Sequence, residues 1–179
     1  MSAPERAQAP TPLRLFFALW PGDAIRVALA DWGRRVQQAA GGRATRSDAI
    51  HLTLAFLGAT EPARLPELEA LGRRIRPRRF ELVLDEAGFW KHNRLAWIGA
   101  RRSPELDELV AELRAALAAA EFPFDPKPFV PHLTLVRKAR PGMDLPALEP
   151  VHWPVRDFVL VRSLLQARGS EYVIQGRWG

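Results

Sequence analysis

The chain has 179 residues, of which 47% are hydrophobic, and its 26 basic against 20 acidic side chains give a net charge of +6. A chain of this length can bury a core without disulfides or metals, and the lack of cysteine excludes thiolate zinc sites, cysteine nucleophiles and iron–sulfur clusters. No apolar run reaches the roughly 18 residues of a membrane span. The excess of basic residues favours a polyanionic partner such as nucleic acid. A genome whose base composition favours arginine codons would produce the same net charge.

The predicted elements follow one another without a linker that would divide the chain. In chain order they are a strand at 14–20, a helix at 24–40, a strand at 49–58, a helix at 62–75, strands at 80–87 and 94–100 around a loop at 88–93, a helix from Ser103, a strand at 131–138, and strands at 154–166 and 171–175. Asp23 is a candidate N-cap of the first helix, which ends at Gly41 and Gly42, and Ser103 is the N-cap of the third.

This order predicts an α+β fold with antiparallel sheets, because neighbouring strands form hairpins instead of a regular strand–helix alternation. Residues 1–12 are rich in proline and alanine and lack the apolar stretch of a signal peptide, so we expect a disordered tail. We expect a single domain over 13–179, in a monomeric, cytoplasmic protein.

One tetrapeptide, His-Leu-Thr-Leu, occurs twice among only four histidines, starting at His51 and at His132. Chance is a poor explanation, and the separation of 81 residues suits one copy in each of two lobes. A single His-x-Thr on a strand is usually a structural edge histidine. Two identical copies favour a functional pair.

Side chains alternate between the two faces of a strand, so each histidine shares a face with its threonine and the leucines take the other. If two lobes pack around a pseudo-twofold axis, His51 and Thr53 meet His132 and Thr134 across a groove. Two imidazoles can divide the work of general base and general acid, and threonine hydroxyls can donate to phosphate oxygens. A metal site is a weaker alternative, because two histidines without nearby acidic or cysteine ligands are a thin set.

The sequence resembles the 2H phosphoesterase superfamily, which is named for two His-x-Thr/Ser-x motifs, and within it the RNA 2′,3′-cyclic phosphodiesterases, formerly called 2′-5′ RNA ligases. The resemblance covers about residues 14–175. It rests on residues 14–18 (RLFFA), 51–58 (HLTLAFLG), 88–89 before 95–99 (LAWIG), 129–137 (FVPHLTLVR), Ser163, Gly169 and Tyr172. It implies a bilobal α+β fold with two antiparallel sheets, helices outside and the active site in the central groove.

The resemblance also implies hydrolysis of the 2′,3′-cyclic phosphate of RNA ends or small nucleotides to a 2′-phosphate, without metal or cofactor. His51 would protonate the leaving 3′ oxygen and His132 would activate water, or the two roles would be exchanged. Thr53 and Thr134 would hold the phosphate.

Two residues outside the His-x-Thr pairs also match the family. Arg137 matches a phosphate contact but lies five residues after His132, so a regular strand would point it to the opposite face. It reaches the groove only if the strand ends or bulges near Val136. Phe17 matches an aromatic residue that stacks on a base.

The other candidates have structural explanations of at least equal weight. His92 lies in a basic loop, where solvation outweighs a role in gripping RNA, and His152 beside Trp153 is expected to be structural. Arg43 and Arg46 fit groove-edge phosphate contacts and plain solvation equally well. Three further functions remain open: 2′-5′ RNA ligation, hydrolysis of a small cyclic nucleotide, and a non-catalytic RNA-binding module.

Overall fold

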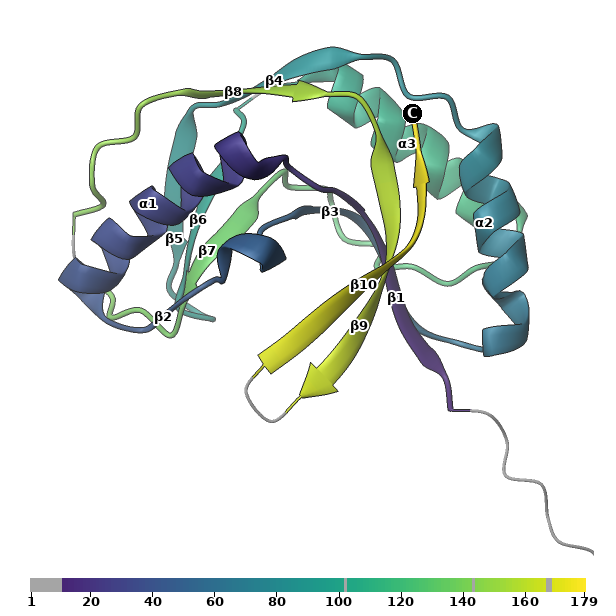
Figure 1. Ribbon diagram of the computed structural model, residues 1–179, viewed down its shortest axis with the longest axis horizontal. Helices are drawn as coiled ribbons and strands as arrows, with labels where there is room; N and C mark the ends of the chain where they lie inside the picture. The colour runs from purple at the N-terminus through teal and green to yellow at the C-terminus, as the bar shows by residue number, and fades with distance from the viewer. Residues whose placement is uncertain (1–10, 102, 143, 167–168) are drawn as a thin grey trace, which may run out of the picture.

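A computed structural model describes residues 11–101, 103–142, 144–166 and 169–179. Most of the segment 1–12, and residues 167 and 168 of the last turn, lie outside this part, so the disordered tail stays a prediction. The described chain contains three α-helices and ten strands, and Figure 1 shows the helices outside the sheets.

The first sheet has the strand order β10-β9-β1-β3, with every pair antiparallel. Its strands are β10 (Gly169–Trp178), β9 (Phe158–Gln166), β1 (Leu13–Leu19) and β3 (Leu52–Thr60). The first His-Leu-Thr-Leu motif is therefore on an edge strand, and the last two strands of the chain pair with the first. Helices α2 (Leu65–Arg74) and α3 (Pro104–Ala119) contact this sheet through β10 and β3.

The second sheet has the order β2-β7-β6-β5 and is also antiparallel. Its strands are β2 (Arg43–Ala44), β7 (Leu133–Arg137), β6 (Leu95–Gly99) and β5 (Glu86–Trp90), and α1 (Asp23–Ala40) packs on β7, β2 and β6. The second motif lies on β7. Each four-stranded sheet thus carries one motif, and strands from the two halves of the chain are interleaved between the sheets.

A two-stranded pair, β4 (Phe80–Leu84) with β8 (Val151–Val155), completes the fold. Here two predicted strands are each divided in the structure. The strand expected at 80–87 separates into β4 and β5, which join different sheets, and the one expected at 154–166 is interrupted at Arg156 and Asp157 between β8 and β9.

The local predictions at helix ends were right at two positions and wrong at one. The Oγ of Ser103 accepts a hydrogen bond from the Leu106 amide at 3.4 Å, and Gly41 and Gly42 leave α1 with positive φ. The N-cap of α1 is Gly22 instead of Asp23, whose carboxylate pairs with Arg26 one turn along. A carboxylate inside the first turn still favours the helix N-terminus electrostatically.

Candidate active site

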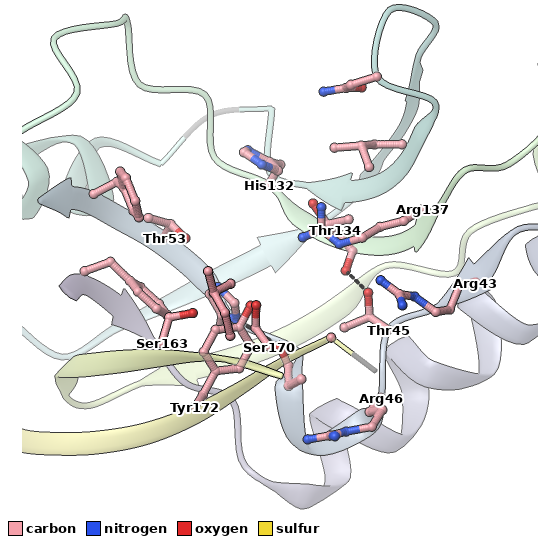
Figure 2. Close-up of a pocket in the computed structure, with 18 of the residues that line it drawn as sticks. Arg43, Thr45, Arg46, Thr53, His132, Thr134, Arg137, Ser163, Ser170 and Tyr172 are labelled. Atoms are coloured by element: carbon pink, nitrogen blue, oxygen red, sulfur yellow. Dashed lines mark hydrogen bonds between the residues drawn. The ribbon is translucent and has the colours of Figure 1, made fainter. Parts of the chain in front are cut away.

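The side chains of both motifs line one groove of about 640 Å³ between the two four-stranded sheets. The expected alternation holds: Thr53 and Thr134 are half-buried and line the groove, whereas the leucines that alternate with them are at most 1% exposed. Figure 2 shows Thr53 and Tyr172 on one side of the groove and Thr134 with Arg137 on the other. The fold therefore assembles two histidines and two threonines around one cavity.

The two histidines are held in the same way. Nδ1 of His51 lies 2.8 Å from the Ala49 carbonyl oxygen, and Nδ1 of His132 lies 2.8 Å from the Val130 carbonyl oxygen. A carbonyl only accepts, so Nδ1 donates its proton in both rings and the Nε2 lone pair of the neutral imidazole is left for chemistry. Each histidine immediately precedes its strand, where the carbonyl two residues earlier can turn toward its ring.

The aromatic surroundings distinguish the two histidines. The His51 ring is stacked on Trp20, with centroids 5.1 Å apart and an interplanar angle of 3°, and it contacts Phe16 and the edge of Tyr172, each at 5.0 Å. The His132 ring has a single aromatic contact in the described chain, the edge of Trp90 at 4.5 Å. His51 is consequently the more enclosed of the pair.

The pKa values of both histidines are lowered, mainly because burial disfavours the charged ring. Burial lowers the pKa of His51 to about 4, with smaller contributions from the charges of Arg137 and His132, while the Ala49 carbonyl opposes the shift. The pKa of His132 falls below its usual 6.5 through burial and the Arg137 charge, against the Val130 carbonyl. Both rings are therefore largely neutral in the free protein at pH 7.

Arg137 lines the groove, and a bulge in β7 explains how it gets there. In the pairing of β6 with β7, Ala96 opposes Val136 but Trp97 opposes Thr134, so Leu135 is an extra residue. Leu135 and Val136 are consecutive buried residues, as a bulge produces, and the alternation is reversed beyond them. The bulge that the sequence required for Arg137 is present.

Phe17 does not face the groove, and its predicted role in base stacking is wrong. It is fully buried, with its ring centroid 6.0 Å from that of Phe158 and 6.2 Å from that of Trp178. Its neighbour Phe16 lines the groove beside His51. Strand alternation explains the difference: Leu13, Leu15 and Leu19 place the odd-numbered side chains of β1 in the core, and Phe17 is on the same face as these leucines.

Several groove residues were only partly identified from sequence. Arg43 and Arg46 line the groove, and Thr45 between them donates through Oγ1 to the Thr134 carbonyl at 2.8 Å, which attaches the first half of the chain to the second motif. Trp20 and Trp90 were not predicted as neighbours of His51 and His132, because a tryptophan in sequence gives no signal of which histidine it will contact.

The remaining two histidines are exposed and are not among the residues that line the groove, although the His92 ring lies 6.5 Å from that of the groove residue Trp90. His92 is exposed in the turn between β5 and β6, and His152 on β8 contacts a Glu81 carboxylate oxygen on β4 at 3.0 Å. Within the described residues, no group of three or more histidine, cysteine, aspartate or glutamate side chains could hold a metal ion. Among the described helices, none is long and apolar enough to cross a membrane.

The sequence profile of the 2′-5′ RNA ligase superfamily matches residues 21–166. The chain belongs to this superfamily. Among curated relatives, the RNA 2′,3′-cyclic phosphodiesterase of Escherichia coli is 35% identical over 93% of this chain and 96% of its own. The RNA 2′,3′-cyclic phosphodiesterase of Thermus thermophilus is 31% identical over 90% and 87%.

Solved structures of similar sequence agree with the fold described above. Escherichia coli LigT in its apo form superposes with a TM-score of 0.81 at 34% identity, covering 94% of this chain and 98% of LigT. LigT complexed with 3′-AMP gives a TM-score of 0.81 at 35% identity over 93% and 97%. The protein TT0787 of Thermus thermophilus also gives 0.81, at 31% identity over 92% and 96%. The bilobal α+β architecture with two antiparallel sheets is thus confirmed.

Proposed function

We propose that this phosphodiesterase hydrolyses the 2′,3′-cyclic phosphate at an RNA end to a 2′-phosphate, using His51 and His132 as a proton-transferring pair. The observation that carries the proposal is the matched geometry of the two rings. In each ring Nδ1 is held by a backbone carbonyl, and Nε2 has no hydrogen bond to any residue that the structure describes. The two histidines precede strands of different sheets and line the same groove. A site that only bound phosphate would not need two titratable groups.

The reaction replaces one P–O bond by another. Water forms a bond to phosphorus while the bond to the ribose 3′ oxygen breaks, so one proton must leave the water and one must reach the departing oxygen. Following the family, we assign the first transfer to Nε2 of His132 and the second to Nε2 of His51. When the substrate is bound, Nε2 of one histidine must therefore be protonated and Nε2 of the other must not.

Binding of the phosphate favours the protonated form of one histidine. The cyclic phosphodiester is an anion, and an anion beside an imidazole favours the charged ring and raises its pKa. Thr53 and Thr134 would donate to the non-bridging oxygens, and Arg137 would balance their charge. Because Arg137 lowers the pKa of both histidines in the free protein, an anion that pairs with it also relieves that repulsion.

The decisive test is incubation of the protein with an oligonucleotide carrying a 2′,3′-cyclic phosphate in the presence of EDTA, with the position of the product phosphate mapped. We expect complete turnover to the 2′-phosphate. Loss of activity in EDTA that a divalent ion restores would overturn the metal-independent mechanism. Three other results would each establish one of the alternatives. Turnover of a small cyclic nucleotide but not of RNA would indicate a cyclic-nucleotide phosphodiesterase, and formation of a 2′-5′ bond with added 5′-hydroxyl RNA would indicate a ligase. Binding without turnover would indicate an RNA-binding module.

The division of roles has its own test, which uses a substrate whose 3′ oxygen is replaced by sulfur. A thiolate leaves without protonation far more readily than an alkoxide because the thiol pKa is only about 8.5. The variant lacking the general acid should therefore recover most of its lost rate on this substrate, and the variant lacking the base should not. Recovery of His132→Ala instead of His51→Ala would exchange the assignment.

A further inference from the structure

A strongly basic surface lies outside the groove. Five exposed arginines, which we call the arginine surface, form it: Arg74, Arg76, Arg78, Arg79 and Arg156. Within the described residues, none of these five side chains forms an ion pair or a hydrogen bond. Uncompensated like charges at close range repel one another, so a surface of this kind is ready to receive an anion.

The fold brings these arginines together from separate parts of the chain. Four of them lie at the end of α2 and in the segment that leads to β4, which Figure 1 shows running past the C-terminal end of β10. Phe80 pairs with Val155 at the end of the β4–β8 ladder, so Arg79 and Arg156 follow at the same end. The Trp178 ring lies directly against Gly72, which fixes α2 beside β10.

A cleft of about 310 Å³ continues this surface. It is lined by Trp20, Trp153, Arg26, Arg156 and Arg177, among others, so Arg156 belongs to both the surface and the cleft. Nε of Arg26, a residue that lines the cleft, is buried without a hydrogen-bond partner in the described chain. Of the three arginines that line the cleft, Arg156 is the one without an ion pair among the described residues.

The acidic residues nearby are already engaged. Asp23 pairs with Arg26, Asp157 pairs with Arg177 at 2.7 Å, and Glu69 lies 4.0 Å from Arg73. Glu81 contacts His152 at 3.0 Å, and its carboxylate lies two residues along the chain from Arg79. The five positive charges of the arginine surface therefore outnumber the acidic charge beside them.

Trp20 links the cleft to the catalytic groove. Its indole lines the cleft and is stacked on the His51 ring at 5.1 Å. The cleft thus adjoins the packing around the catalytic pair, and a strand of several nucleotides whose end occupies the groove could extend to it.

We propose that the arginine surface and its cleft bind the phosphodiester backbone of the RNA substrate beyond its cyclic end. The proposal rests on the proposed function, because it concerns the body of the same substrate. A row of guanidinium groups binds the backbone of single-stranded nucleic acid, with arginine forks on the phosphates. Of the rings that line the cleft, Trp153 is buried and Trp20 is partly buried, so the proposal rests on phosphate contacts. The array extends over two elements and a cleft, which fits a polymer better than a single phosphate.

The test compares two substrates on one variant. Arg76, Arg78 and Arg79 are replaced together by glutamine, and kcat/KM is measured on a 2′,3′-cyclic mononucleotide and on a 20-nucleotide RNA with the same cyclic end. We expect kcat/KM to fall at least tenfold on the RNA at low salt and to stay unchanged on the mononucleotide. A matched control, with Arg34, Arg35 and Lys127 replaced by glutamine, removes the same charge elsewhere and should leave the RNA rate within about twofold.

Direct binding separates this proposal from the proposed function. Anisotropy of a labelled 20-nucleotide RNA ending in a 2′-phosphate is measured over a range of salt concentrations, so no turnover is needed. Each lost phosphate contact lowers the slope of log K against log salt by about 0.7, so the triple variant should lose about 2 from the slope. If the wild type does not hydrolyse the cyclic phosphate but its salt slope still exceeds that of the triple variant by about 2, the proposed function is overturned and the RNA-binding proposal is supported.

Three results would overturn the proposal that the arginine surface binds RNA. They are an equal loss of kcat/KM on both substrates, an equal loss of RNA rate in the control variant, and an unchanged salt slope in the triple variant. Binding to phosphatidylserine vesicles that the triple variant loses, with the RNA slope unchanged, would assign the surface to a membrane instead.

Discussion

At the scale of single residues, the proposed mechanism gives the two histidines and the two threonines different tasks, so their variants should lose different amounts of activity. Removing a proton-transfer group costs about 10²–10⁴ in rate, so His51→Ala and His132→Ala should form the lower tier of activity. Thr53→Ala and Thr134→Ala each remove one hydrogen bond to a charged group, worth about 1.5–3 kcal/mol, or about ten- to a hundred-fold in kcat/KM. The double histidine variant should be little worse than either single variant, because the pair serves one displacement.

Folding should survive in all four variants, since these side chains face the groove and not the leucine-rich core. Circular dichroism and thermal unfolding provide this control before kinetics are compared. A folded His→Ala variant that keeps near wild-type turnover of a cyclic-phosphate substrate would exclude the two-histidine mechanism.

The lowered pKa values of both rings determine the pH profile. The kcat/KM profile reports the free enzyme, in which burial places the pKa of His51 at about 4 and that of His132 below 6.5. We expect a bell whose maximum lies below pH 6.5, and a kcat profile displaced to higher pH because the bound anion raises both pKa values. Measurement between pH 3.5 and 10 checks this, and a kcat/KM maximum above pH 7 contradicts it.

The same burial makes stability depend on pH. His51 is harder to protonate in the folded chain, at a pKa of about 4, than in the unfolded chain, at about 6.5. Its contribution is therefore complete above pH 6.5 and is lost as the pH falls from 6.5 toward 4. Between pH 8 and pH 5 the wild type should lose up to about 2 kcal/mol more of its unfolding free energy than His51→Gln, an upper limit because the half-buried ring is partly screened by solvent. Equal losses in urea unfolding of the two proteins would refute this link.

At the scale of elements, the approach of β6 to the second motif depends on Gly99. A Cβ at this position would lie 2.2 Å from the Pro131 carbonyl oxygen, directly before His132. Gly99→Ala must therefore push β6 and β7 apart, at a cost typical of overpacking, about 1–3 kcal/mol, or about 3–10 °C in Tm. Because Pro131 directly precedes His132, moving Pro131 should also displace the His132 ring. We therefore expect kcat/KM to fall even at temperatures where the variant is folded.

Gly22→Ala is the matched control, since no atom lies within 4 Å of the added Cβ and φ is −70°. Because alanine is less favourable than glycine at an N-cap, it should lower Tm slightly, by less than Gly99→Ala does, and it should leave kcat/KM unaltered. If Gly99→Ala behaves like Gly22→Ala, the close approach of the two strands does not position His132.

At the scale of the whole molecule, the groove is lined by residues of two sheets, so a ligand bound in it would contact both. A 2′-phosphorylated nucleotide at a hundred times its Kd should stabilise the fold by about 2.7 kcal/mol, which raises Tm by about 5–10 °C. Arg137→Met removes the charge expected to balance the phosphate, so this variant should need a higher ligand concentration for the same shift. Differential scanning fluorimetry at a series of concentrations measures both, and an unchanged concentration dependence would remove Arg137 from the phosphate site.

The sequence by itself determined the motif strands and the faces of their side chains, because strand alternation is a local property of period two. His51, Thr53, His132 and Thr134 meet in the groove as the repeat predicted, and the same rule applied to β1 would have placed Phe16 there instead of Phe17. Helix positions and the Ser103 cap were equally local, since they depend on residues within a few positions of each other.

Only the tertiary structure decided how these local pieces are combined. The pairing of β9 and β10 with β1, the separation of β4 from β5 and the bulge at Leu135 all depend on contacts between residues far apart in the chain, which no local pattern specifies. The same holds for the aromatic rings around His51, which lower its pKa and give the two identical motifs different surroundings. Two copies of one tetrapeptide became chemically unequal because burial is a property of the whole fold.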